Sequence, residues 1–397
     1  MRVSEMQPFI MFVFTLCSRS ALLFALTALC LPAWSATNVS GTISVDTVWD
    51  DPIYLVAGSV SVIPDVTLTI QPGTVFKFNE SLVLDIQGQL LAEGTAAEPI
   101  HFTDVRDDTV GGDTNGDGDA TAPAAGWWRG IELRGAGSAT LAHVSVRYAG
   151  HRSGFSSGEA GIWHQGTGAL SVTDSVVLDS ARYGIFIENS MAAHSITATR
   201  LLHNGLDGIR VNGATTGLQM FANRIEGSGG NGITLVDLGM PVSVSGNQVQ
   251  ANGAHGIEIR NGEGDFHRNV VRGNGASGFR IVGASATPHL RRNVVMLNPI
   301  GIDVDTGADP LIGGSAEDGN DLAANTEFGV RNSDSSLTIN ARFNWWGDPS
   351  GPFHPEDNPG GLGNEVSDWV DFSDFLDEST YDRLFRDRFE ALDNTGA

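Results

Sequence analysis

Short segments of alternating apolar and polar residues run along most of the chain, and they recur at a regular interval. The clearest unit is a glycine followed by an apolar, a variable and a second apolar residue, and its glycines lie 22–24 residues apart. The unit occurs at Gly184–Ile187, Gly208–Val211, Gly232–Leu235, Gly256–Ile259, Gly278–Ile281 and Gly301–Val304. Alternation with a period of two predicts β-strands rather than helices. A glycine before each strand predicts a turn that needs a positive φ.

Asparagines recur in phase with these glycines. One set begins a second short strand, and a further asparagine follows five residues later in most repeats. The two sets are Asn223, Asn247, Asn269 and Asn293, and then Asn252, Asn274 and Asn298. A repeat of this length without a helical segment predicts one coil of a parallel β-solenoid, whose turn asparagines stack and pair amide to amide. Leucine-rich repeats have a similar period, but their leucine–asparagine consensus and helical half are absent.

The pattern divides the chain into six segments. They are a signal peptide (1–35), an N-terminal cap with the first coils (36–104), an acidic insertion (105–125), regular coils (126–345), a C-terminal turn and cap (346–376), and an acidic amphipathic tail (377–397). The longer, less regular alternation before residue 105 indicates the same fold with less uniform coils.

The first segment has the pattern of a secretory signal. Arg2 and Arg19 precede an apolar run over 21–31, and small residues follow it, which predicts cleavage after Ser35. An uncleaved anchor that uses the earlier apolar run at 8–17 is the alternative. Both cysteines lie in this segment, so we expect a secreted, periplasmic or cell-surface chain without disulfides and without a transmembrane span.

Charge narrows the classes of partner. The 397 residues include 23 Lys and Arg against 47 Asp and Glu, a formal net charge of −24, and Lys77 is the only lysine. Because nucleic-acid phosphates require a basic surface, this balance argues against a nucleic-acid partner. An apolar fraction of 41% is enough for a packed core. We expect the chain to be a monomer.

Four further motifs indicate a known family. They are Ile63–Gly73, Trp128–Ile131, Tyr148–Gly150 and Asn344–Pro352. Together with the repeat they resemble secreted bacterial β-helix repeat proteins over residues 38–376. The resemblance implies an all-β, right-handed parallel β-helix of the pectate-lyase-like type with capped ends. It implies no single function, because such proteins include lyases, hydrolases, epimerases and adhesins.

The acidic insertion contains a candidate calcium site. Asp113, Asn115, Asp117 and Asp119 alternate with small residues, so several hard oxygens can surround one ion. The spacing resembles the start of an EF-hand loop, but position twelve would be Ala124 instead of a bidentate glutamate. We therefore predict a structural Ca²⁺ site, with a solvated acidic loop as the alternative.

The variable residue of each glycine-led strand should point outward and form a column. Its members are Trp163, Phe186, Arg210, Thr234, Glu258, Arg280 and Asp303, with Asp305 two residues beyond. One hypothesis makes Asp303, Asp305, Glu258 and Arg280 catalytic and Trp163, Phe186 and Arg210 ligand-binding. Two carboxylates about 6.5–7 Å apart suit inverting glycoside hydrolysis. The alternative is a surface ion ladder with scattered aromatic residues.

These observations predict an exported scaffold that binds a glycan or a cell-surface polymer. A polysaccharide lyase or glycoside hydrolase that acts in a groove on the same face is the second hypothesis. No nucleophile elbow or phosphate loop is present, and the ten histidines lack short metal-ligand spacing.

Overall fold

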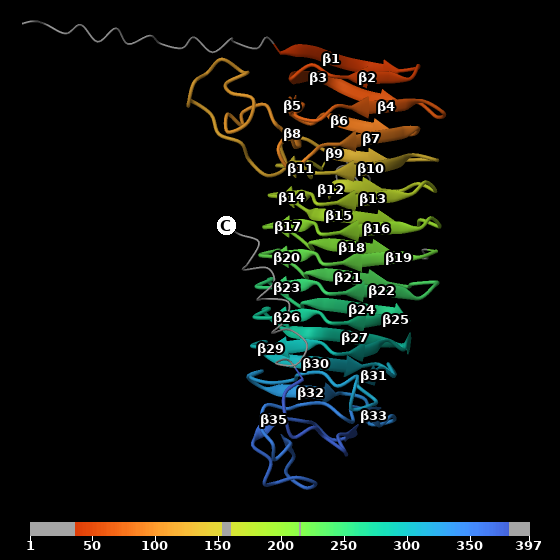
Figure 1. The fold of residues 1–397 in the computed structure, drawn as a ribbon, viewed down its shortest axis with the longest axis vertical. Helices are drawn as coiled ribbons and strands as arrows, with labels where there is room; N and C mark the ends of the chain where they lie inside the picture. Colours follow the sequence, from red (N-terminus) through yellow and green to blue (C-terminus); the bar gives the residue numbers. More distant parts are fainter. Residues whose placement is uncertain (1–35, 153–159, 214–215, 381–397) are drawn as a thin grey trace, which may run out of the picture. The chain divides into compact units, whose positions relative to one another are not determined.

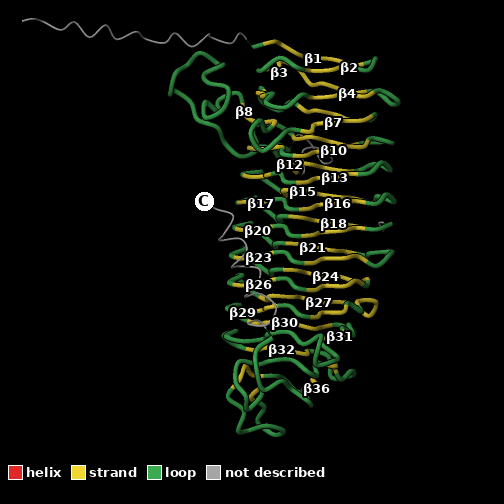
Figure 2. The backbone as a smooth tube through the Cα atoms, viewed as in Figure 1, coloured by secondary structure: helices red, strands yellow, loops and turns green. Residues whose placement is uncertain are grey.

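The computed structural model describes residues 36–152, 160–213 and 216–380. These residues form parallel β-strands and turns and contain no helix, so the predicted all-β solenoid is confirmed. Each regular coil contributes three short strands, and successive coils lie beside each other in chain order (Figures 1 and 2). The predicted signal peptide and most of the acidic tail lie outside the described residues. Within the described part, no helix is long and apolar enough to cross a bilayer.

The strands fall into three columns, which we call faces 1, 2 and 3. Face 1 carries the glycine-led strands and consists of β6 (Val83–Ile86), β9 (Gly130–Leu133), β12 (Ala160–His164), β15 (Tyr183–Glu188), β18 (Ile209–Asn212), β21 (Ile233–Val236), β24 (Ile257–Gly262), β27 (Ser277–Ala286), β30 (Ile300–Asp305) and β32 (Phe328–Asn332). Each strand pairs in parallel with the strands of the preceding and following coils.

Face 2 is an 11-stranded parallel sheet. It consists of β2 (Thr47–Trp49), β4 (Thr67–Ile70), β7 (Gln89–Glu93), β10 (Ser138–Ala142), β13 (Leu170–Thr173), β16 (His194–Thr197), β19 (Leu218–Phe221), β22 (Val242–Ser245), β25 (Gly264–His267), β28 (His289–Arg291) and β31 (Leu311–Ile312).

Face 3 completes each coil. It consists of β5 (Val75–Phe78), β8 (Ile100–Asp104), β11 (Val144–Arg147), β14 (Val176–Leu178), β17 (Arg200–Leu202), β20 (Arg224–Glu226), β23 (Gln248–Gln250), β26 (Val270–Arg272) and β29 (Val294–Met296). The first strands, β1 (Thr37–Ile43) and β3 (Ile53–Val62), bend across two faces, because β3 pairs with β5 through its first half and with β6 through its second. The last turns contain β33 (Ile339–Asn340), β34 (Pro352–Phe353), β35 (Gly363–Glu365) and β36 (Val370–Asp371).

Inward side chains of successive coils stack in register and form the core. On face 1 one such column runs Ile185, Ile209, Ile233, Ile257, Phe279 and Ile302. All six are fully buried. Because each aliphatic side chain rests on its counterpart one coil away, the apolar column is continuous and excludes water along the stack.

The asparagine ladders are confirmed. In the ladder between faces 2 and 3, each side-chain amide donates to the Oδ1 of the next asparagine at 2.9–3.0 Å, from Asn223 to Asn344. A second ladder between faces 3 and 1 joins Asn252 to Asn325 at 3.0–3.2 Å. The same Oδ1 atoms also accept backbone N–H groups, so the buried turns keep their polar groups paired.

The glycines that lead the face-1 strands are required for a different reason from the one predicted. None of the six has a positive φ. A Cβ on Gly256 would instead lie 2.4 Å from Val271 Cγ1 and 2.7 Å from the carbonyl oxygen of Gly278 on the next coil. Close approach between coils therefore excludes a side chain here, and the prediction of positive φ is wrong.

Candidate functional site

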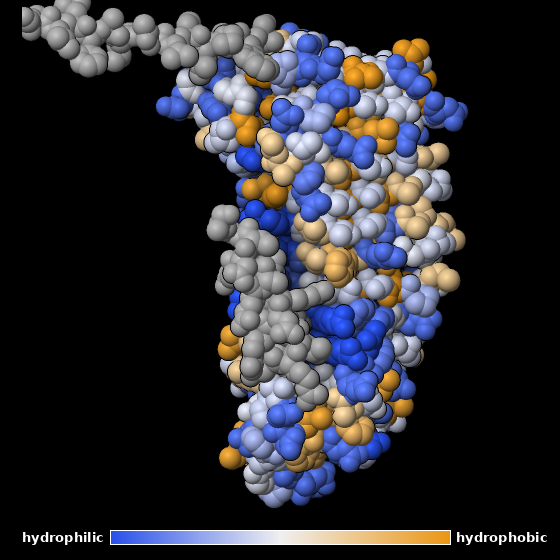
Figure 3. All heavy atoms as spheres, viewed as in Figure 1, coloured by the Kyte–Doolittle hydropathy of each residue, from blue (hydrophilic) through white to orange (hydrophobic). Residues whose placement is uncertain are grey.

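The strand register brings the predicted site residues into one column on face 1. Outward residues of the paired strands run Asp85, Glu132, Trp163, Phe186, Arg210, Thr234, Glu258, Arg280, Asp303 and Arg331. The sequence identified its middle section, and Asp305 lies two residues beyond Asp303 on β30. Asp85, Glu132 and Arg331 extend the column at both ends and come from less regular coils. Figure 3 shows hydrophilic residues gathered around β24 and β27.

Asp303 and Asp305 are held by arginines from the neighbouring coils. Arg331 donates from Nε and Nη2 to the two carboxylate oxygens of Asp303 at 2.9 and 3.0 Å. Arg280 donates to Asp303 at 2.5 Å and to Asp305 at 2.8 Å. The bond from Arg280 lowers the pKa of Asp305, and the bond to Asp303 raises the pKa of Arg331. The lowered pKa favours the carboxylate form of Asp305, and both Asp303 and Asp305 are engaged by arginines of neighbouring coils.

Glu258 is engaged on both of its oxygens. Oε1 accepts from Nε of Arg260 at 2.7 Å, and Oε2 accepts from the side-chain amide of Asn231 at 2.7 Å. The same amide donates to the hydroxyl of Thr234 at 3.0 Å. Because Glu258 is buried, these bonds fix its carboxylate in one orientation. The acidic side chains at this end of the column, Glu258, Asp303 and Asp305, are therefore already paired.

His255 lies beside this network and was not among the site residues predicted from the sequence. Its Nδ1 accepts the backbone N–H of Ser277 at 3.1 Å, so the neutral ring carries its proton on Nε2. Burial lowers the pKa of His255, and Arg280 contributes in the same direction while Glu258 opposes it. In this tautomer His255 can donate a hydrogen bond to a ligand, but it has no free lone pair with which to accept a proton.

The aromatic end of the column is packed. The rings of Trp163 and Phe186 stack with centroids 6.2 Å apart and planes 3° apart, and Tyr183 packs against Phe186. Trp163 and Phe186 are only 2% and 6% exposed, so they do not present the open stacking faces that the sequence indicated. Arg210, the third predicted ligand-binding residue, donates to Asp207 and Asn212 on its own coil. Sugar binding at this end stays a prediction and requires the ring faces to become accessible.

The acidic insertion brings part of the predicted calcium set together. Carboxylate oxygens of Asp108, Asp113 and Asp117 lie within 4.8 Å of one another. Asp113 accepts the backbone N–H groups of Gly116 and Gly118, and the bond from Gly118 is the main cause of its lowered pKa. Asp119 is outside this group, and the amide of predicted ligand Asn115 donates to Thr121. Asp108 was missed because it precedes the alternating motif.

The only lysine lies directly beneath this insertion. Lys77 is fully buried on face 3, and its Nζ donates to the backbone carbonyls of Asp107, at 2.9 Å, and Gly112. Nζ also lies 4.0 Å from Oδ1 of Asp108. Burial lowers the pKa of Lys77, whereas the surrounding aspartates raise it. The ammonium thus anchors the insertion to the solenoid. Because it is fully buried, it cannot act as a base on a ligand at the surface.

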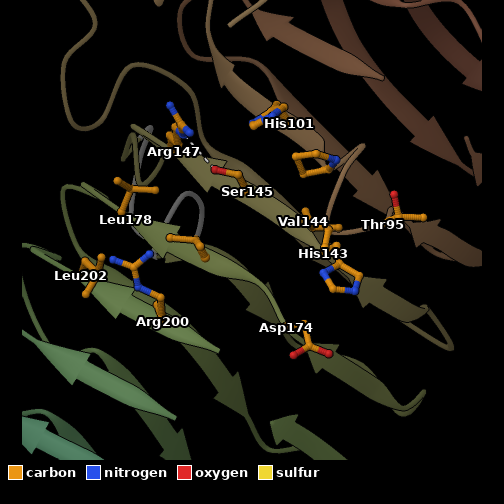
Figure 4. Close-up of a pocket in the computed structure, with 13 residues that line it drawn as sticks. Thr95, His101, His143, Val144, Ser145, Arg147, Asp174, Leu178, Arg200 and Leu202 are labelled. Carbon is orange, nitrogen blue, oxygen red and sulfur yellow. Dashed lines mark hydrogen bonds between the residues drawn. The ribbon is translucent and has the colours of Figure 1, made fainter. Parts of the chain in front are cut away.

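A pocket of about 380 Å³ lies on face 3, over β8, β11, β14 and β17 (Figure 4). His101, Arg147 and Arg200 line it, together with His143 and Asp174 from the turns that precede β11 and β14. These residues were not predicted from the sequence as a group. They are spread between residues 101 and 200, and only the register of four coils places them together.

Comparison with known proteins places the fold. Residues 160–316 match the family model described as right-handed beta helix region. The crystal structure of the periplasmic alginate epimerase AlgG is similar, with a TM-score of 0.57 and 15% identity over 81% of this chain and 78% of that one. The A-module of AlgE6, a mannuronan C-5 epimerase of Azotobacter vinelandii, has a TM-score of 0.47 and 14% identity over 87% of this chain and 91% of that one. Among curated proteins, no sequence matches significantly. This chain is thus a right-handed parallel β-helix, as its motifs implied.

Proposed function

We propose that this protein is an exported β-helix scaffold that binds a glycan along face 1 without turning it over. The observation that carries the proposal is the pairing of Glu258, Asp303 and Asp305 with arginines or an amide on neighbouring coils. Paired, fixed charges offer hydrogen bonds to sugar hydroxyls at regular spacing along the coils. A net charge of −24 favours neutral glycans over polyuronates.

The same contacts argue against hydrolysis. An inverting glycosidase needs one protonated carboxylic acid and one free carboxylate on opposite sides of the bond that breaks. Here Asp303 and Asp305 share Arg280, whose bond lowers the pKa of Asp305 and thus disfavours a protonated acid. A lyase or an epimerase needs a base for the α-proton. His255 has its Nδ1 occupied, and Lys77 is buried on another face.

An enzyme remains the second hypothesis, because His255, Glu258, Arg280 and Asp303 are the kinds of group that sugar chemistry uses. The structural neighbours named above are epimerases of alginate or mannuronan, and their likeness concerns the fold alone. An epimerase inverts a carbon without cutting the chain. A test for catalysis must therefore include a readout of epimerisation besides chain cleavage.

The experiment presents the purified chain with neutral and uronic polysaccharides. Retention on a glycan array supports binding, while assays of reducing ends and unsaturated ends, and NMR of mannuronan, detect hydrolysis, elimination and epimerisation. Arg260→Gln removes an exposed face-1 charge and should weaken retention, whereas Arg272→Gln on face 3 is the matched control. Turnover of any polymer overturns the scaffold proposal, and a chain retained by no glycan overturns the binding proposal.

Export is part of the same proposal and is supported by the sequence pattern of residues 1–35. We propose cleavage after Ser35, which would make Ala36 the first residue of the mature chain, next to β1. N-terminal sequencing of the protein recovered from the periplasm or the medium tests it. A full-length N-terminus on cytoplasmic protein contradicts both export and cleavage.

We also propose that the acidic insertion binds a structural Ca²⁺ through Asp108, Asp113 and Asp117. Three carboxylates that share one small volume form a hard-oxygen set of the type that Ca²⁺ requires. A bound Ca²⁺ would offset the negative charge of these three carboxylates and so reduce the repulsion between them. A chelator should then lower the melting midpoint, and Asp113→Asn should abolish that effect. Asp119→Asn, outside the group, is the control, and an unchanged midpoint with chelator favours the solvated-loop alternative.

A further inference from the structure

The pocket on face 3 differs in charge from the rest of the surface. Although the chain carries a net charge of −24, the described residues that line the pocket include Arg147, Arg200, His101 and His143 and a single acid, Asp174. In Figure 4, Arg147 and Arg200 lie toward one side of the pocket, and His143 and Asp174 lie toward the other. An anion that enters on the arginine side therefore meets a local positive potential on an otherwise repelling protein.

The adjacent coil provides an internal reference for Arg200. Arg200 pairs in register with Arg224, and Leu202 pairs with Glu226. On that next coil, Nε of Arg224 donates to Glu226 at 2.7 Å, so its charge is neutralised by a residue of its own strand. On β17 a leucine stands in the position of that glutamate. The exposed guanidinium of Arg200 consequently has no acidic partner among the residues that the structure describes.

The remaining lining supplies an apolar floor and an unpaired polar atom. Val176, Leu178 and Leu202 are half-buried side chains of β14 and β17 that line the pocket beside Arg200. The Nδ1 atom of His101 is buried and has no hydrogen-bond partner within the described part of the chain. Arg147 donates to the hydroxyl of Ser145 at 2.8 Å and lies 3.7 Å from Asp107, so it is partly engaged. The combination of a free guanidinium with aliphatic walls suits a ligand that has both an anionic and an apolar part.

We propose that this pocket binds a small carboxylate with an apolar body, its carboxylate on Arg200 and its body on Val176, Leu178 and Leu202. A planar guanidinium binds a carboxylate through two parallel hydrogen bonds, which gives orientation as well as affinity. A volume of about 380 Å³ is at the lower end of the range for small-molecule pockets, so the ligand is compact. The site lies on face 3 and is independent of the glycan proposed for face 1.

The test titrates the full chain with benzoate, with its neutral isostere benzamide and with inorganic phosphate, followed by calorimetry or NMR. We expect benzoate to bind at least about tenfold more tightly than benzamide or phosphate. Arg200→Gln should weaken benzoate binding about tenfold or more. Leu202→Glu should abolish it, because it recreates the Arg224–Glu226 pair one coil earlier.

Arg224→Gln removes the equivalent arginine one coil away, outside the pocket lining, and should leave benzoate affinity unchanged. The melting midpoint of each variant is measured alongside, and Arg200→Gln keeps the test valid if Leu202→Glu does not fold, because Arg200 is exposed. Absence of benzoate binding, equal binding of benzamide or phosphate, or unchanged affinity in Arg200→Gln would each overturn the proposal.

Discussion

A pair of buried histidines should make the solenoid sensitive to acid. His194 on β16 is stacked in register between Leu170 and Leu218, in a column that is otherwise aliphatic, and it is 2% exposed. Its Nδ1 accepts the backbone N–H of Leu170 at 3.2 Å, and its Nε2 lies 2.9 Å from the hydroxyl of Ser190. The ring of His164, which is also buried, packs edge-on against the ring of His194, with the two centroids 4.8 Å apart. Burial, with a smaller contribution from His164, lowers the pKa of His194 to about 4.

The lowered pKa of His194 sets the sign and the size of the change in stability with pH. An unfolded histidine has a pKa of about 6.5, so between pH ~6.5 and ~4 the unfolded chain holds a proton that the folded chain does not. Stability is therefore complete above pH ~6.5 and is lost as the pH falls toward 4. A difference of about 2.5 pKa units, at about 1.4 kcal/mol each, gives a loss of about 3 kcal/mol from this residue alone.

His194→Leu removes the titrating group and continues the leucine column above and below it. At about pH 7 the variant should be less stable by about 1–3 kcal/mol, because the Leu170 N–H loses its acceptor. That deficit should shrink and then vanish as the pH falls to about 4. Urea unfolding followed by tryptophan fluorescence, at a series of pH values, measures both curves.

His203→Asn, on an exposed imidazole, is the matched control and should follow the wild-type curve. If wild type and His194→Leu lose stability in parallel as the pH falls, His194 is not the acid-sensitive group. The inference from burial to pKa would then be wrong.

Three further substitutions, two of them with a comparison variant, test the packing and the ion network by urea unfolding. Asn269→Ala removes a buried amide that donates to Val244 O and to the next ladder asparagine, and it should cost about 3 kcal/mol; a cost below about 1 would mean that the ladder contributes little. Gly256→Ala places a Cβ 2.4 Å from a valine methyl and should cost about 1–3 kcal/mol, whereas Gly360→Ala, with open space around it, should be near neutral; equal costs would refute the steric argument. Asp303→Asn leaves two arginines without their shared counter-charge and should destabilise by about 3 kcal/mol, against less than about 1 for the more exposed Asp305→Asn. A stable Asp303→Asn variant would show that the network is loosely held.

The fold was predictable because its determinants repeat. The spacing of glycine, aliphatic residues and asparagine indicates the length of one coil. Because each coil contacts only its neighbours, this local pattern predicts the arrangement of the whole solenoid. The strand hydrogen bonds fix the distance between coils at about 4.8 Å, but the sequence does not reveal which atoms of the next coil face each glycine. The predicted positive φ was therefore wrong: a Cβ on Gly256 would lie 2.4 Å from Val271 Cγ1, so the glycine is required by this contact and not by the turn.

The sites were less predictable because they depend on deviations from the repeat. Alternating signs at Glu258, Arg280 and Asp303 indicated a column, but the arginine that completes it, Arg331, comes after a longer coil, 28 residues from Asp303.

The face-3 pocket arises in the same way. The sequence contains Arg-Ile-Glu at 224–226 and Arg-Leu-Leu at 200–202, and these segments gain meaning only when the register shows that they occupy equivalent positions. In a repeat protein the shared pattern determines the scaffold. At 200–202 the chain departs from the pattern of the next coil, because a leucine stands where that coil has a glutamate, and Arg200 lacks the acidic partner that Arg224 has. That departure is the observation on which the proposed carboxylate site rests.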